Sequence, residues 1–147
     1  MFISFIQIAI QEAQKAFQKN EVPIGAVIVK NNQVIAKAYN QVITKKDATA
    51  HAEILAIQKA CKKLKTEKLI DCDIYVTLEP CSMCAAAISH AQIKRLYYGA
   101  SNPKEGAIEH NSKLYQNKSC NYIPEVYSGF EEQKCSELLK DFFQSKR

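Results

Sequence analysis

The sequence predicts an α/β protein, a three-layer α/β/α sandwich built around a mixed five-stranded sheet. Segments with apolar residues at helical spacing alternate with short runs rich in β-branched and aromatic residues. An asparagine-rich turn joins two of the short runs, which indicates a β-hairpin. Helical segments stand before, between and after the other runs, which is typical of a sheet with helices on both faces.

The elements of the N-terminal half follow from this alternation. Apolar residues from Phe2 to Phe17 recur every three or four positions, which predicts an amphipathic helix packed on the core. The runs 24–29 and 34–39 flank the turn 30–33 and form the predicted hairpin. A second helix is indicated by four residues that share one helical face: Ile54, Ile57, Cys61 and Leu64.

The C-terminal half continues the pattern. We predict a strand over 74–78, a helix from Cys81 to about His90, a strand over 93–98, a polar loop with one short helical piece over 100–123, a strand over 125–127 and a final helix. That last helix is indicated by the spacing of Cys135, Leu138, Leu139, Phe142 and Phe143.

Length and composition indicate one domain, residues 1–147, because no repeat, linker or low-complexity tract divides the chain. The apolar first ten residues lack the basic start and cleavage site of a signal peptide, and no segment is long enough to span a membrane. We therefore expect a cytoplasmic protein. The net charge of +5 is compatible with a polyanionic partner but too small to indicate one. One lysine cluster fits either an RNA-binding patch or a solvated helix end: Lys62, Lys63, Lys65 and Lys68.

Two short motifs at predicted helix starts carry the chemistry: His51-Ala52-Glu53 and Pro80-Cys81-Ser82-Met83-Cys84. Cys81 and Cys84 are three positions apart, so they share one face in the first turn of a helix. The positive end of a helix favours thiolate over thiol. Two thiolates and one imidazole are common zinc donors. The sequence thus predicts a zinc site with the ligands His51, Cys81 and Cys84.

Three protein ligands, rather than four, indicate a catalytic site, because the fourth position stays open to water. Zinc activates such a water near neutral pH. Glu53, two residues after His51, is placed to take the water's proton, deliver it to a ring nitrogen and then help to protonate departing ammonia. The order His-x-Glu, then Pro-Cys-x-x-Cys, is the signature of zinc-dependent nucleobase deaminases.

The cysteine pair also allows other interpretations. A redox-active CxxC explains neither His51 nor Glu53, and the thioredoxin-like pattern that usually carries it is missing. A structural zinc site needs a fourth ligand, for which His90 and His110 are the candidates, although His90 falls at the far end of its helix. The scattered cysteines are interpreted as inert apolar side chains rather than disulfide partners: Cys61, Cys72, Cys120 and Cys135.

Three segments, 21–29, 47–57 and 75–88, closely resemble the bacterial tRNA-specific adenosine deaminases. The similarity runs from about Phe5 to the C-terminal DFFQSKR, and EVPIGAV, TAHAE, LEPCSMC and DFF select this branch of the superfamily. The resemblance implies a cytidine-deaminase-like fold, one zinc ion per subunit and a homodimer. It also implies a tRNA anticodon stem-loop as partner, whose wobble adenosine is converted to inosine.

The resemblance further implies substrate contacts, because a base of an anticodon loop must be splayed out to reach a buried metal. The expected contacts are Asn40, the backbone N–H of Ala52, Asn102, Lys104 and Phe143, with Lys146 and Arg147 near phosphate. Alternatives stay open: Asn40 also suits a strand-end turn, and Phe142 or Phe143 also suits core packing.

The chain departs from the family at Asn102, where an aspartate is common. Loss of that negative charge eases the approach of a phosphate backbone, which predicts looser nucleic-acid selectivity, including action on single-stranded DNA. The segment 108–122 matches the family poorly, so no contact is carried over there. The alternative functions are a small-molecule purine or pyrimidine deaminase of the same superfamily and a non-catalytic RNA-binding subunit, against which the presence of Glu53 argues.

Overall fold

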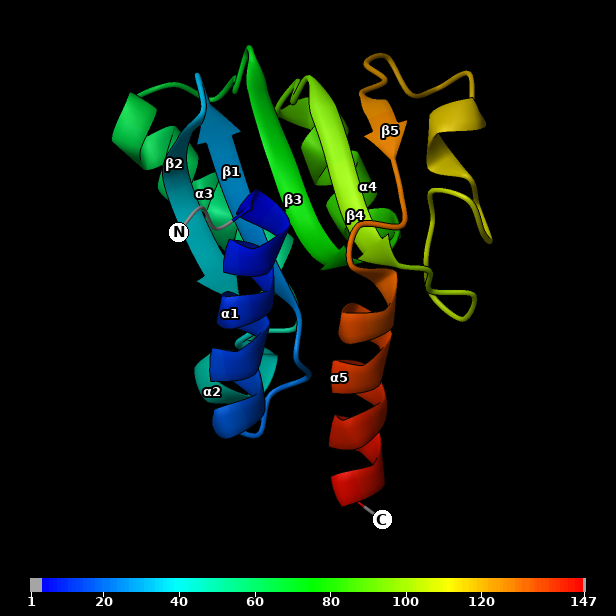
Figure 1. Ribbon diagram of the computed structural model, residues 1–147. Coiled ribbons are helices and arrows are strands. Elements are labelled where there is room, and N and C mark those ends of the chain that lie inside the picture. The colour runs from blue at the N-terminus through cyan, green and yellow to red at the C-terminus, as the bar shows by residue number, and fades with distance from the viewer. Residues whose placement is uncertain (1–3, 147) are drawn as a thin grey trace.

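A computed structural model describes residues 4–146 and contains one mixed sheet with helices on both faces (Figure 1). The elements in chain order are α1 (Phe5–Gln18), β1 (Gly25–Lys30), β2 (Gln33–Tyr39), α2 (Val42–Lys45), α3 (Ala52–Leu64), β3 (Cys72–Leu78), α4 (Ser82–His90), β4 (Arg95–Ala100), the 3-10 helix η1 (Leu114–Gln116), β5 (Glu125–Tyr127) and α5 (Glu132–Ser145). None of the described helices is both long and apolar enough to cross a membrane.

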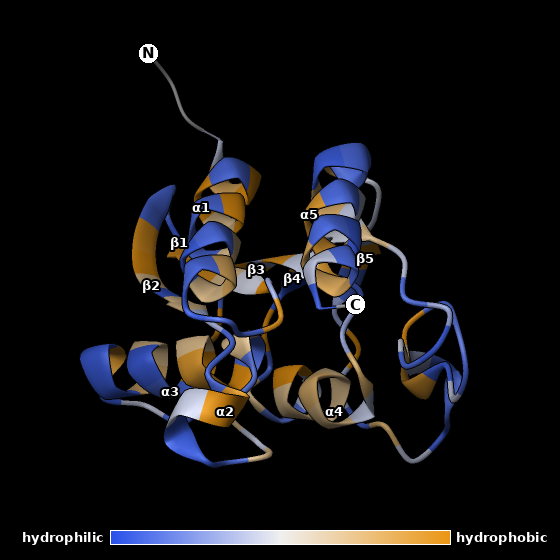
Figure 2. Cartoon of the chain, turned by 90° about the horizontal axis from the view of Figure 1, so that it is seen from below, coloured by the Kyte–Doolittle hydropathy of each residue, from blue (hydrophilic) through white to orange (hydrophobic). Residues whose placement is uncertain are grey.

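The sheet has the strand order β2-β1-β3-β4-β5. β1 pairs antiparallel with β2 and β3, whereas β3–β4 and β4–β5 are parallel pairs. Seen from below, α1 and α5 cover one face, and α3 and α4, with α2 beside them, cover the other (Figure 2). The predicted three-layer α/β/α sandwich with a mixed five-stranded sheet is confirmed.

The hairpin and the first helix show why the local sequence folds as predicted. Asn31 and Asn32 have φ values of 52° and 60°, the left-handed pair that a two-residue type I′ turn requires. At the start of α1, the Ser4 hydroxyl accepts the Gln7 N–H and the Gln7 side chain accepts the Ser4 N–H, which forms a capping box. Phe2 and Ile3, which we assigned to this helix, lie outside the described residues.

Two elements differ from the prediction. The sequence did not predict α2, because a four-residue helix without a buried side chain has no apolar period to detect. The strand predicted from residue 93 begins at Arg95 instead. Ile93 lies in the turn after α4, where its N–H donates to the Ile88 carbonyl at 3.3 Å.

Small residues bring the helices close to the sheet. Ala52, Ala56 and Ala60 line the inner face of α3 and are fully buried. On the other face, α1 lies so near β1 that a Cβ on Gly25 would come within 2.0 Å of the Ala9 carbonyl oxygen. Close packing of α3 and α4 against the same face of the sheet puts the starts of both helices near each other.

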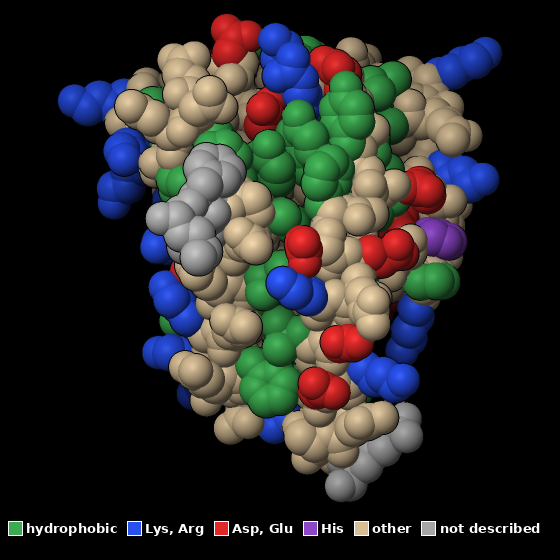
Figure 3. All heavy atoms as spheres, in the orientation of Figure 1, with side chains coloured by type: hydrophobic (Ala, Val, Ile, Leu, Met, Phe, Trp, Pro, Cys, Tyr) green, Lys and Arg blue, Asp and Glu red, His purple; other side chains and the backbone are tan. Residues whose placement is uncertain are grey.

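Aromatic rings stack across the other sheet face, beside α1. The Tyr75 and Tyr97 rings are 4.4 Å apart, and the Tyr97 and Tyr127 rings are 5.1 Å apart. Phe5 and Phe130 border this stack at 5.5 and 5.3 Å from their nearest ring. Figure 3 shows hydrophobic side chains gathered on this side of the molecule. These contacts hold the strands in register away from the two motifs.

The six cysteines all lie in the described part of the chain, and none of them forms a disulfide. Cys72 and Cys135 are buried, and Cys61 and Cys120 are partly buried. All four are free thiols, but the Cys120 Sγ atom lies 3.3 Å from the Ser89 hydroxyl and 3.3 Å from the Tyr122 carbonyl, so the interpretation of all four as inert apolar side chains stays a prediction.

Candidate active site

The two sequence motifs meet at the starts of α3 and α4. The Nδ1 atom of His51 lies 3.7 Å from the Sγ atom of Cys81 and 3.5 Å from that of Cys84. One donor atom from each of the three residues lies within 4.8 Å of the other two. Among residues 4–146, no fourth His, Cys, Asp or Glu side chain joins this group.

Helix geometry explains why these donors converge. His51 is the N-cap of α3 and Cys81 is the N-cap of α4, both with extended backbones, and neither side chain caps its own helix. Cys84 follows in the first turn of α4 and is buried. The side chains are therefore free of capping bonds and lie at two converging positive helix ends, which favour thiolate.

Mutual hydrogen bonds shift the pKa values of the three donors. A hydrogen bond from Cys84, opposed by burial and aided by His51, lowers the pKa of Cys81 to about 4. The pKa of Cys84 is raised by that same hydrogen bond and by burial. The hydrogen bond with Cys81 also raises the pKa of His51, against the effect of burial. A thiolate beside a thiol and an imidazole is a metal site that exchanges its protons for a cation.

Glu53 stands in the first turn of α3 and is only 4% exposed. Its Oε1 atom is buried and has no hydrogen-bond partner. Burial is the main cause that raises the pKa of Glu53 to about 7. A buried oxygen without a partner costs free energy, so it marks a group that gains its partner from a ligand or water.

Neither of the other candidate histidines joins the cluster. The Nδ1 atom of His110 forms a hydrogen bond with Oε1 of Glu79 at 2.8 Å, so this ring contacts Glu79 and not the cluster. His90 is the last residue of α4, so the length of that helix separates it from Cys81. The set of donors therefore remains three, which is the open arrangement.

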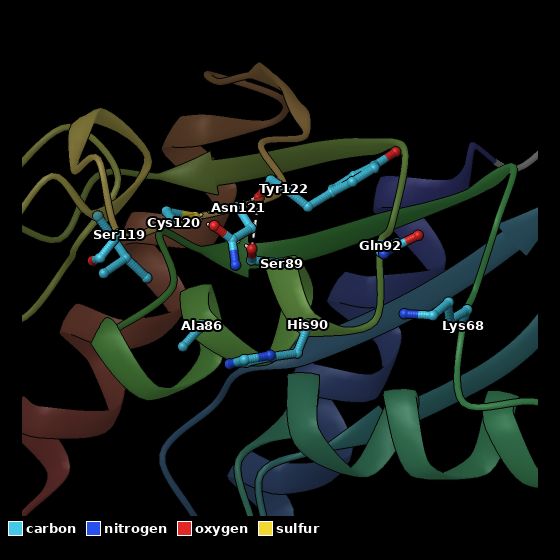
Figure 4. Close-up of a pocket in the computed structure, with 10 residues that line it drawn as sticks. Lys68, Ala86, Ser89, His90, Gln92, Ser119, Cys120, Asn121 and Tyr122 are labelled. Atoms are coloured by element: carbon cyan, nitrogen blue, oxygen red, sulfur yellow. Dashed lines mark hydrogen bonds between the residues drawn. The ribbon is translucent and has the colours of Figure 1, made fainter.

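His90 instead lines a separate polar pocket of about 370 Å³. Figure 4 shows this pocket between the end of α4 and the segment 119–122. Ser89 closes one side, where its hydroxyl donates to the Tyr122 carbonyl at 2.6 Å. None of the residues that line the pocket belongs to the cluster of His51, Cys81 and Cys84, so this pocket is separate from the candidate metal site.

Asn40 and Ala52 are expected to contact substrate and are both buried. The Asn40 amide donates to the Val22 carbonyl at 3.3 Å, and its oxygen accepts the Val42 N–H at 3.4 Å. These two bonds fit the strand-end role of Asn40, and its contact with substrate stays a prediction. Ala52 is the first residue of α3, and the helix's own hydrogen bonds leave its N–H free.

Asn102 and Lys104 lie in a loop that packs on the second motif. The loop meets Cys81 through a backbone bridge to Gly106, and Ala107 N–H donates to the Pro80 carbonyl at 2.9 Å. The Asn102 side-chain oxygen accepts the Glu105 N–H at 3.2 Å, and Lys104 is exposed. The structure thus brings both residues to the part of the loop that adjoins Cys81.

The two phenylalanines near the C-terminus have different environments. Phe142 is 5% exposed and its ring lies 5.6 Å from that of Phe17, whereas Phe143 is 50% exposed. Core packing is therefore correct for Phe142, and Phe143 is accessible. Lys146 donates to the Asn20 side chain at 2.9 Å, and the expected contact of Arg147 lies outside the described residues.

Sequence reasoning did not assign roles to two buried glutamates, Glu21 and Glu79. Glu21 accepts the N–H groups of Ile43 and Thr44 at 3.1 and 2.6 Å, and Glu79 accepts those of the loop that holds Asn102. No local pattern in the sequence shows these contacts, because the backbone partners of each carboxylate lie at least 22 positions away.

The α/β/α fold and the His-Cys-Cys cluster beside a buried glutamate define a deaminase of the cytidine-deaminase-like class. The profile of the MafB19-like deaminase family matches residues 3–147. A tRNA-specific adenosine deaminase of Agrobacterium fabrum is 50% identical over 143 residues, 97% of this chain and 94% of the relative. The chain therefore belongs to the tRNA-specific adenosine deaminase family.

Solved structures agree with this assignment. One from a study of A-to-I editing by tRNA deaminases at the wobble position is 50% identical, with a TM-score of 0.91 over 92% of this chain and 98% of that one. A guanine deaminase of Bacillus subtilis is 34% identical, with a TM-score of 0.65 over 97% of this chain and 91% of that one. The backbone thus lies closer to the tRNA deaminase than to this small-molecule enzyme.

Proposed function

We propose that this protein hydrolytically deaminates the wobble adenosine of a tRNA anticodon to inosine. The observation that carries the proposal is the convergence of His51, Cys81 and Cys84 beside the buried, unpartnered Oε1 of Glu53. The 50% identity over nearly the whole chain to a tRNA-specific adenosine deaminase supports the choice of substrate.

Zinc fits the three donors. Two cysteine sulfurs and an imidazole nitrogen lie close enough together to bind one ion, and the lowered pKa of Cys81 leaves a thiolate ready for it. Bound there, zinc would supply Lewis-acid activation of water at neutral pH. We therefore infer one zinc ion per subunit, with His51, Cys81 and Cys84 as its protein ligands.

Glu53 performs the proton transfers. Its carboxylate takes a proton from the attacking water and delivers it to a ring nitrogen of the adenine. It then takes the proton of the new hydroxyl group on the ring carbon and passes it to the amino group, so that the C–N bond breaks, ammonia leaves and the carbonyl of inosine forms. Burial favours a carboxyl group that both accepts and releases a proton near pH 7, because each protonation state is then accessible. Position in the first turn of a rigid helix fixes its direction relative to His51.

The residues around the cluster form the substrate walls. We infer that Asn40 and the Ala52 N–H contact the nucleoside from buried positions, that Asn102 and Lys104 contact the flanking backbone, and that the exposed Phe143 ring contacts a neighbouring base. The target base leaves its stack to enter. We further infer a cytoplasmic homodimer in which residues 1–147 form one catalytic domain.

The first experiment measures inosine in an anticodon stem-loop with a wobble adenosine, with free adenosine, cytidine and guanine in parallel. Inosine in the RNA alone is the expected result. The second candidate function is small-molecule deamination, favoured by the similarity to the Bacillus subtilis guanine deaminase. Turnover of a free base or nucleoside without any in the RNA would replace the first proposal by the second. An inactive, zinc-loaded protein would indicate the non-catalytic RNA-binding subunit.

A further inference from the structure

The loop between β4 and η1 wraps around the buried carboxylate of Glu79. Glu79 is 1% exposed and stands between the end of β3 and the second motif. Its Oε1 accepts the Asn102 N–H at 3.0 Å. Its Oε2 accepts three consecutive N–H groups at 3.1, 2.9 and 3.2 Å: those of Ile108, Glu109 and His110. A charged acceptor shared by several backbone donors holds a loop more strongly than neutral bonds do.

The loop leaves no spare room over this carboxylate. A Cβ on Gly106 would come within 2.4 Å of Glu79 Cδ and 2.5 Å of the Asn102 carbonyl oxygen. The Gly106 N–H donates to that same carbonyl at 2.7 Å and closes the turn. Glycine is therefore required for steric reasons, and the turn rests directly on Glu79.

A second polar side chain holds the loop from its other side. The Asn111 amide nitrogen donates to the carbonyls of Gly106, Pro103 and Lys104 at 2.7, 3.3 and 3.3 Å. The segment 102–106, called here the rim segment, is thus held at its start through the Asn102 N–H, on its other side through three backbone carbonyls, and just beyond its end through the N–H groups of 108–110. The bridge between Gly106 and Cys81 places it beside the cluster.

We propose that Glu79 is a positioning residue, which holds the rim segment in place beside Cys81 so that RNA meets a pre-ordered surface. This inference rests on the proposed function. A rim without its anchor must be ordered when RNA binds, and that entropy cost weakens binding. The chemistry of a bound nucleotide is unaffected, so KM changes more than kcat.

The test compares two variants that disturb the same contact in different ways. Glu79→Gln turns one acceptor into an N–H donor facing N–H groups, and Gly106→Ala inserts a methyl group between the rim segment and the carboxylate. For each, we expect KM for the anticodon stem-loop to rise about 10- to 100-fold, with kcat within about threefold of the parent, because lost pre-organisation acts on binding. Zinc content stays at the parent level.

Amide hydrogen exchange supplies a readout that does not depend on activity. In Glu79→Gln, exchange at Asn102, Ile108, Glu109 and His110 is expected to speed up at least about tenfold relative to the parent, because these N–H groups lose a charged acceptor. Leu69→Ala is the control, because Leu69 is equally buried but lies near the other end of α4, where its N–H donates to the Ala91 carbonyl. It lowers Tm without changing KM or the exchange at these four positions.

Each outcome decides the inference. Unchanged exchange, loss of zinc, or a rise in KM without faster exchange would overturn it. An inactive parent protein would refute the proposed function, and the exchange measurement would still decide whether Glu79 holds the rim segment. If Glu79→Gln and Gly106→Ala do not fold, Glu79→Asp keeps the charge but withdraws the carboxylate from these N–H groups, and unchanged KM and exchange at the same four positions would then overturn the inference.

Discussion

The Nδ1 atom of His51 lies 3.5 Å from the Sγ atom of Cys84, although the two residues are 33 positions apart. One belongs to the start of α3 and the other to the first turn of α4. The sheet brings the helix starts together, because the chain enters α3 after the carboxyl end of β2 and enters α4 after that of β3. These two strands run in the same direction, so their carboxyl ends lie on the same side of the sheet. A metal-binding role for this pair can be tested directly.

Replacement of one donor should remove the metal. Cys84→Ser is expected to lower zinc content from one ion per chain to less than about a tenth of that, because structural and catalytic zinc sites depend on each thiolate. Plasma mass spectrometry after dialysis measures it. Cys120→Ser, outside the cluster and partly buried, is the control and keeps its zinc. Full zinc content in Cys84→Ser would remove this residue from the ligand set.

Glu53→Gln should separate chemistry from metal binding. The amide keeps the shape of the side chain but cannot accept and release the proton, so kcat should fall by roughly 10² to 10⁴. Zinc content and Tm should stay near those of the parent. Glu67→Gln, an exposed residue after α3, is the control. Parental turnover in Glu53→Gln would show that another group moves the proton.

The sequence predicts those parts of the site that local patterns specify. The HAE and PCxxC motifs each lie on one helix start, so spacing alone identifies their residues. The role of Glu79 could not be predicted, because its partners lie 23 to 31 positions away in a loop without apolar periodicity. For Phe142 and Phe143, periodicity places both on the last helix, and only the packing against Phe17 decides which is buried.

Glu21 should make stability depend on pH. Burial opposes its charge, but hydrogen bonds from Thr44 and Ile43 lower its pKa below 4.5. A lowered pKa stabilises the fold fully above the unfolded value, and this contribution is lost as the pH falls through the folded value.

Glu21→Gln should therefore cost about 2 kcal/mol at pH 7, as expected for hydrogen bonds to a charged group. The difference in Tm between parent and variant should shrink as the pH falls below 4.5, the ordinary pKa of a glutamate. Calorimetry between pH 3 and pH 7, with Glu67→Gln for comparison, measures it. A difference in Tm that stays constant over this range would contradict the assignment.

The neighbouring phenylalanines should have separable effects. Phe142→Ala empties a buried site, which should cost about 3 to 5 kcal/mol and lower Tm by about 10 °C. Phe143→Ala, at a half-exposed position, should leave Tm within about 2 °C and raise KM for the stem-loop about tenfold, the magnitude of one lost base-stacking contact. Thermal denaturation and steady-state kinetics of both variants decide this. Unchanged KM in Phe143→Ala would exclude the contact with RNA.

Asn102→Asp isolates the effect of charge on nucleic-acid selectivity. The Asn102 side chain acts in the turn as an acceptor for the Glu105 N–H, and an aspartate oxygen accepts the same bond. The substitution therefore adds a negative charge beside the expected path of the phosphate backbone while the turn is kept. We expect the parent to deaminate adenine in single-stranded DNA and Asn102→Asp to do so at least about fivefold more slowly, the effect of about 1 kcal/mol at one phosphate contact. Asn121→Asp adds the same charge at an exposed position of the pocket near His90 and is the control. Equal DNA deamination by Asn102→Asp and the parent would show that the charge at this position does not set selectivity.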